Sequence, residues 1–182
     1  MIRRIRPLIV ATLASAALLL ARPALAGPPL LCFPFEIGTA RTLPMGHGIW
    51  HATDPTYDVS RLVDDTLALL TPDTPVKVRM ETIRRATIYA SAQPRAANAL
   101  LEALQKRAEH PQPAVAALAV FDFGYLVETY REAKYMFKQP ALAIEGIDGY
   151  QLVLKAHALQ NDPTMQEAAK LIADGQPQRA TR

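Results

Sequence analysis

The side chains best suited to metal chemistry lie in one short stretch near the start of the chain. Cys32, Met45, His47 and His51 supply a thiol, a thioether and two imidazoles. Soft sulfur ligands with imidazole suit copper, and thiolate with imidazole also suits zinc. His47 and His51 are four residues apart, a spacing that would converge on a helix, but the glycines on both sides of His47 disfavour a helix there. One hypothesis is therefore a copper or zinc site formed by Cys32, His47 and His51.

The same stretch has two other interpretations. Cys32 is the only cysteine, so no internal disulfide can form, and in an oxidising compartment its thiol could serve a redox role or link two chains into a disulfide-bonded dimer. Alternatively, Cys32, Phe33 and Phe35 pack beneath the helices as an apolar plug, with Trp50 beside them. The metal and redox hypotheses require an accessible Cys32 thiol, whereas the apolar plug requires a buried and unreactive one.

Asp122 is a second candidate for chemistry, because it is the single charge in the apolar run 114–127. Burial raises the pKa of an acid, so this carboxyl could handle protons near neutral pH. A buried carboxylate is more often paired, since an isolated buried charge is costly. We therefore favour an ion pair with one of the arginines in neighbouring turns, namely Arg79, Arg84, Arg85 or Arg131.

No recognised catalytic motif accompanies these residues. The segment after residue 26 contains only two serines, Ser60 and Ser91, and neither lies in the glycine-flanked turn of a nucleophilic serine. The chain also has no glycine-rich phosphate loop, paired-cysteine zinc motif or His-Glu-x-x-His sequence. The sequence thus favours a protein that is not an enzyme.

The first 26 residues have the pattern of a cleaved signal peptide. Arginines at positions 3, 4 and 6 precede an apolar run of 13 residues, 8–20, and Ala24-Leu25-Ala26 is a typical cleavage sequence. We predict a mature chain that begins at Gly27 and is periplasmic or secreted. The apolar run is shorter than the roughly 20 residues that cross a bilayer, and we expect no integral membrane segment in the mature chain.

The basic character of the chain comes from this leader. The full sequence has 20 basic and 17 acidic residues; cleavage removes four arginines and no acid, which leaves 16 basic and 17 acidic side chains. Nucleic-acid binding depends on clustered positive charge. The composition of the mature chain therefore predicts no nucleic-acid partner.

The rest of the chain is predicted to be helical. Residues 27–56 are irregular and rich in proline and glycine, whereas apolar residues recur at helical spacing from Val59 to Leu70, with Asp58 as N-cap. Prolines at 75, 94 and 113 each open a further helix, and two more are expected over about 147–159 and 163–175. We predict an all-α domain over 57–175, a stack of about six antiparallel helices arranged as hairpins, a superhelix or an irregular bundle, followed by a frayed tail at 176–182.

Within the second of these helices, Val76, Met80, Ile83, Thr87 and Ala90 are expected to form the buried face, and Arg79, Arg84 and Arg85 to lie largely off it. The fourth, from about Pro113 to Phe137, is apolar nearly all round, which is typical of a helix in the middle of a packed domain. Gly124 inside it predicts close approach of a neighbouring helix.

The fourth helix also holds most of the aromatic residues of the domain. Aromatic residues that form a stripe along a helix usually belong to the core. Helical repeats, however, also hold peptides through aromatic side chains that line a groove. The sequence thus suggests a groove beside this helix that binds a protein or peptide partner through Phe121, Tyr125, Tyr130 and Tyr135.

Two segments carry a resemblance to other proteins. The opening Gly27–Gly38 (GPPLLCFPFEIG) and the segment Arg79–Ala86 (RMETIRRA) resemble a group of uncharacterised secreted bacterial helical-hairpin proteins, and the resemblance covers most of the mature chain. The 34-residue span 75–108 has the length of a tetratricopeptide repeat and resembles such repeats in general shape. Neither resemblance implies an activity.

Overall fold

The computed structural model describes residues 27–109, 111–112, 115–138 and 143–175. The predicted signal peptide, the predicted helix start at Pro113 and the tail after residue 175 lie outside these residues. Within them the chain forms helices and no strand, which confirms the predicted all-α fold. The elements are the 3-10 turn η2 (Val59–Arg61) and the helices α2 (Leu62–Leu69), α3 (Val76–Ala90), α4 (Pro94–Glu109), α5 (Ala116–Met136), α6 (Gly149–Gln160) and α7 (Pro163–Gly175).

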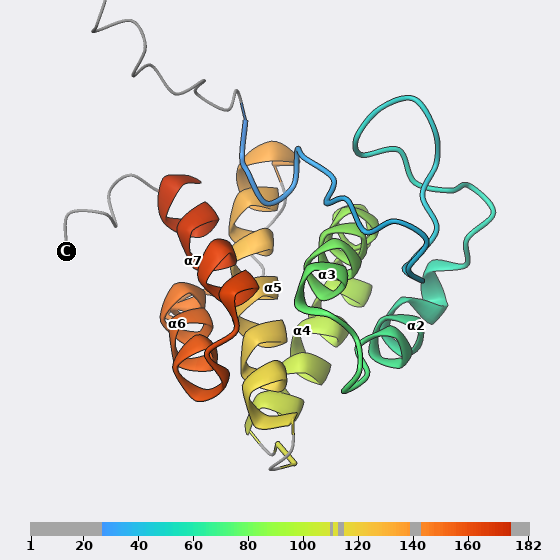
Figure 1. Ribbon diagram of the computed structural model, residues 1–182. Helices are drawn as coiled ribbons and strands as arrows, with labels where there is room; N and C mark the ends of the chain where they lie inside the picture. Colours follow the sequence, from blue (N-terminus) through green and yellow to red (C-terminus); the bar gives the residue numbers. More distant parts are fainter. Residues whose placement is uncertain (1–26, 110, 113–114, 139–142, 176–182) are drawn as a thin grey trace, which may run out of the picture.

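Helix α5 is the centre of the bundle. It contacts α3 and α4 on one side and α6 and α7 on the other, and α2 packs against α3 and α4 at the periphery (Figure 1). Most of α5 is buried, from Leu118 to Tyr130, as its nearly continuous apolar sequence predicts. The main core joins side chains of every helix to Leu30 and Leu43 of the irregular segment.

The helix boundaries agree with the signals in the sequence. The Asp58 side chain accepts a hydrogen bond from the Ser60 N–H, and that of Asp162 accepts from the N–H groups of Thr164 and Met165 at the start of α7. Helix α3 begins directly after Pro75, and α4 begins at Pro94. Short polar caps and prolines therefore set where these helices begin.

The expectation for α3 was wrong for two of its arginines. Arg79 and Arg84 are 1% and 2% exposed, and almost the whole helix is buried. The irregular segment 27–56, here called the strap, runs from beside α5 and α7 across α3 to α2 and contacts Arg84, whereas Arg79 contacts α5 and the turn before α3 (Figure 1). A helix that is covered on both sides has no free face for its charged side chains. They are buried with polar partners instead.

Gly124 marks the contact between α5 and α6, as predicted. A Cβ atom at this position would lie 2.7 Å from the Leu152 Cβ and 2.8 Å from the Gly149 carbonyl oxygen. Gly149 opens α6, and a Cβ there would lie 2.5 Å from the Gly124 carbonyl oxygen. Two glycines thus allow the two backbones to touch.

We expect Gly124→Ala to lower the free energy of unfolding by up to about 2 kcal/mol, measured by urea denaturation. Overpacking of this kind costs about 1–3 kcal/mol, and alanine returns roughly 1 kcal/mol of helix propensity. Asn98→Ala, at an exposed position of α4, is the control for propensity alone. A Gly124→Ala variant more stable than the wild type would show that α5 and α6 do not meet this closely.

Candidate functional site

A row of polar side chains on α3 holds the backbone of the strap. Arg84 Nη1 donates to the Leu31 and Trp50 carbonyl oxygens at 2.9 and 3.3 Å, and Arg85 Nη1 donates to the Leu43 carbonyl oxygen at 2.7 Å. Further along the helix, the Tyr89 hydroxyl donates to the Pro44 carbonyl oxygen and accepts from the Asp54 N–H, both at 3.0 Å. The strap has no regular secondary structure, so its buried backbone groups need such partners.

Glu81 is the centre of this polar row. Its carboxylate accepts two hydrogen bonds from Arg84 at 2.8 and 3.0 Å, one from Arg85 at 2.7 Å and one from the Phe35 N–H at 3.0 Å. Burial raises the pKa of Glu81, but the hydrogen bonds and charges of Arg84 and Arg85 outweigh this effect and hold the pKa below its ordinary value. The carboxylate is therefore ionised at neutral pH and joins α3 to the strap.

Glu132 of α5 holds the beginning of the strap. Its carboxylate oxygens accept from the Leu30 N–H at 3.0 and 3.2 Å and from the Leu31 N–H at 3.1 Å. Burial raises the pKa of Glu132 to about 7; the two N–H groups lower it and the charge of Glu128 raises it. These bonds place Leu30 and Leu31, which are 1% and 0% exposed, in the core.

The raised pKa of Glu132 predicts a pH-dependent stability. Between the ordinary carboxyl pKa of 4.5 and about 7, the folded state binds more protons than the unfolded state, so stability falls as pH rises through 7. We expect Glu132→Gln to remove up to about 1.4 kcal/mol per pH unit of this slope, measured by urea denaturation between pH 5 and 8. Glu102→Gln, on the exposed face of α4, should leave the slope unchanged. Equal slopes for wild type and Glu132→Gln would contradict the assignment.

Asp122 is paired, as predicted, and its partner is Arg79. The Arg79 Nη1 lies 2.6 Å from the Asp122 Oδ2, and both side chains are 1% exposed. Burial raises the pKa of Asp122 to about 6, and the charge and hydrogen bond of Arg79 act in the opposite direction. Arg79 also donates to the carbonyl oxygens of Thr71 and Thr74. The pair therefore fixes the α2–α3 turn onto α5.

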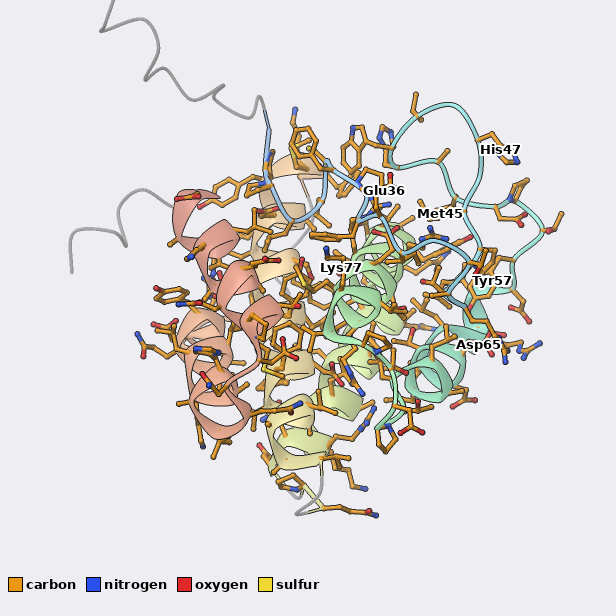
Figure 2. The ribbon with its side chains drawn as sticks, in the orientation of Figure 1. Glu36, Met45, His47, Tyr57, Asp65 and Lys77 are labelled. Carbon is orange, nitrogen blue, oxygen red and sulfur yellow. The ribbon has the colours of Figure 1, made fainter. Side chains whose placement is uncertain are left out.

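The three residues of the predicted metal site lie in different surroundings. Cys32 is partly buried, and burial first, then the charge of Glu132, raises the pKa of its thiol, whereas Arg84 lowers it. The His51 ring packs on Trp50 and Phe137, with ring centres 4.6 and 6.0 Å apart. His47 projects from the loop, away from the helices (Figure 2).

Among the residues that the structure describes, no three His, Cys, Asp or Glu side chains form a group that could hold a metal ion. A copper or zinc site and a thiol-redox role or disulfide-linked dimer through Cys32 stay predictions from the sequence.

The predicted apolar plug is built mainly from other residues. Leu30 and Leu31, directly before Cys32, are fully buried, while Phe33 is 39% exposed. Phe35 packs at the edge of the main core, and Trp50 packs against a smaller cluster formed by Leu31, Ile88 and Ala133. The plug therefore lies two residues earlier than expected, because Glu132 fixes the backbone at Leu30 and Leu31.

Three of the four aromatic residues predicted to bind a partner are in the core. Phe121 and Tyr125 are 0% exposed and stack with ring centres 5.6 Å apart, and Tyr130 is 1% exposed and donates to the Ala97 carbonyl oxygen. In this structure these three rings are enclosed by the helices around α5. Tyr135, near the end of α5, is 79% exposed.

Exposed apolar side chains lie on the segments that meet at the C-terminal end of α5. Of the five large apolar side chains that are exposed in the described part of the chain, Tyr135 and Met136 belong to this end, and Phe33 and Ile49 to the strap around it; the fifth is Leu159 at the end of α6. Trp50, next to Ile49, packs on Phe137 with ring centres 5.9 Å apart. We call Phe33, Ile49, Tyr135 and Met136 the α5-end surface. Only Tyr135 was among the predicted binding residues, since neither an apolar residue in a loop, such as Phe33 or Ile49, nor one at a helix end, such as Met136, indicates a surface by itself.

A second feature is a pocket of about 560 Å³ between the strap and α2. Its walls come from strap residues 40–44, from the Asp65, Ala68 and Leu69 side of α2, and from the α2–α3 turn and Val78. At its edge the Tyr57 hydroxyl donates to the Asp65 carboxylate at 3.0 Å (Figure 2). We call it the strap–α2 pocket. Nothing in the helical periodicity predicts it, because it exists only where the strap lies against α2.

The chain matches no protein-family model, and no curated protein or solved structure shows significant similarity to it. None of the described helices has the length and apolar character that a membrane-spanning helix needs. The function proposed below therefore depends on the chain's own sequence and geometry.

Proposed function

We propose that this chain is an exported helical interaction protein that binds a protein or peptide partner at the α5-end surface. The signal-peptide pattern of residues 1–26 supports export. The observation that carries the binding proposal is that four of the five large apolar side chains exposed in the described part of the chain lie on segments that meet at the end of α5. Exposed apolar residues scattered singly need no explanation, but a contiguous patch is typical of interaction sites.

The groups around this surface suggest the chemistry of the partner. Tyr135 and Met136 are residue types enriched at protein interfaces, and both present flexible or amphipathic contact area. Lys134, 45% exposed and 3.8 Å from Glu145, and the exposed Lys138 lie beside them on the chain. A segment with apolar side chains flanked by acidic ones would complement this composition.

Site-specific photocrosslinking in the native host tests the proposal. A benzoylphenylalanine at position 135 is expected to crosslink the mature chain to a discrete protein, and the same group at position 98, on the exposed face of α4, is not. Tyr135→Ser combined with Met136→Ser should abolish the crosslink from a probe at position 49, while the urea midpoint stays that of the wild type. Equal crosslinking from positions 135 and 98, or none from either, would overturn the proposal.

A further inference from the structure

We propose that the strap–α2 pocket binds a small zwitterion with an apolar body, of the size and chemistry of a dipeptide. The pocket is separate from the α5-end surface, and this inference does not depend on the proposed partner. Its volume of about 560 Å³ lies within the range of small-molecule sites, about 300–1,000 Å³. Leu43 and Val78, both buried, and the half-buried Leu69 form apolar walls for the body of the ligand.

The charges of the pocket define the two ends of the ligand. Arg41 and Asp73 are exposed residues that line it, and neither makes a hydrogen bond or ion pair with any described residue, including each other. Asp65, by contrast, is already bonded to Tyr57 and Arg61 at 3.0 Å each. The unpaired guanidinium is suited to a carboxylate and the unpaired carboxylate to an ammonium group. A molecule that carries both charges at opposite ends would complement this pocket.

The walls of the pocket are held in place before any ligand binds. Arg85 donates to the Leu43 carbonyl oxygen at 2.7 Å, and the Thr42 and Thr82 hydroxyls are 3.1 Å apart, which fixes the strap wall to α3. On the opposite wall, Arg79 donates to the carbonyl oxygens of Thr71 and Thr74. A wall that is already ordered loses little conformational entropy on binding, which favours affinity for a small ligand.

Titration of the mature chain with the dipeptide Ala-Leu, followed through backbone amide NMR signals, tests the proposal. We expect saturable shifts at residues 40–43 and 71–74. N-acetyl-Ala-Leu, which lacks the ammonium group, and Ala-Leu-amide, which lacks the carboxylate, should each bind about fivefold more weakly. Absence of saturation by Ala-Leu up to about 10 mM, or shifts confined to other parts of the chain, would overturn the proposal.

Two substitutions test which pocket residue contacts the carboxylate of the ligand and which contacts its ammonium group. In Arg41→Gln, Ala-Leu and its amide should bind equally, and in Asp73→Asn, Ala-Leu and its acetylated form should bind equally. Asp64→Asn and Arg95→Gln, at exposed positions that do not line the pocket, are the matched controls and should keep the wild-type preferences. If both pocket variants retain those preferences, Arg41 and Asp73 do not read the ligand's charges and the assignment is wrong.

Discussion

Asp122→Ala is expected to lower the free energy of unfolding by about 3–5 kcal/mol at pH 7. The substitution leaves the Arg79 guanidinium, which is 1% exposed, without the carboxylate 2.6 Å away. Removal of one partner of a buried ion pair typically costs this much, because the remaining charge is neither solvated nor neutralised. Urea denaturation of residues 27–182 measures the effect. A loss below 1 kcal/mol would show that water or another group reaches Arg79.

The reverse substitution should behave differently with pH. In Arg79→Met the Asp122 carboxyl loses its cation, and burial, which already raises its pKa to about 6, then acts unopposed by this partner. A raised pKa in the folded state means that stability is lost as pH rises. We therefore expect the stability of this variant to fall more steeply than that of the wild type from pH 5 to pH 8.

Substitution of both Arg79 and Asp122 distinguishes the contribution of the ion pair from that of the other hydrogen bonds of Arg79. A well-packed apolar replacement of a buried ion pair is often close to neutral. In Arg79→Met with Asp122→Leu, however, the carbonyl oxygens of Thr71 and Thr74 still lose a donor. We expect the double variant to recover part of the loss of Asp122→Ala, and the remainder estimates the contribution of Arg79 to the α2–α3 turn.

The helices could be predicted from sequence because their signals are local. Pro75 and Pro94 fix φ at the start of α3 and α4, and Asp58 and Asp162 supply oxygen atoms to free N–H groups. These effects act within four residues, so they are visible in the sequence. That Asp122 would pair with an arginine could also be predicted, although not which one, because an unpaired buried charge is costly in any fold.

The buried polar residues of α3 could not be placed in the same way. Periodicity assigns Arg79 and Arg84 to a solvent-facing side, since it assumes that one side of a helix faces water. In this chain the strap lies on Arg84, which donates to the Leu31 carbonyl oxygen, whereas Arg79 is buried against α5 and the α2–α3 turn, where it pairs with Asp122. The position of an irregular segment depends on contacts more than forty residues apart, which no local pattern contains.

The candidate sites depend on the same long-range contacts. The strap–α2 pocket requires strap residues 40–44 to lie against α2, and the α5-end surface requires Phe33 and Ile49 to lie near the end of α5. Of the four aromatic residues selected from sequence, only Tyr135 is exposed, because α5 is covered along most of its length. An aromatic stripe indicates a core or a groove, and only the positions of the neighbouring helices distinguish the two.

Glu81→Ala is expected to release the strap from α3 and to cost about 3–5 kcal/mol. Arg84, 2% exposed, would lose both hydrogen bonds to its carboxylate, and the Phe35 N–H would lose its acceptor. Since the folded-state pKa of Glu81 is lowered, its contribution in the wild type is present at neutral pH and is lost as pH falls through that pKa. Urea denaturation at pH 7 measures the loss, with Glu102→Ala on α4 as the exposed control.

Limited proteolysis distinguishes release of the strap from uniform loss of stability. If Glu81 holds the strap, Glu81→Ala should be cut within residues 32–56 under native conditions, while α5, buried by its neighbours, stays intact. Asp122→Ala, of similar cost, removes an ion pair whose hydrogen bonds join α5 to the α2–α3 turn and not to the strap, and it should not show this preference. Because Arg85 depends on Glu81 and also holds the Leu43 carbonyl oxygen, release should remove Ala-Leu binding as well. Cleavage spread over the helices in both variants would mean that the strap and the bundle unfold as one unit.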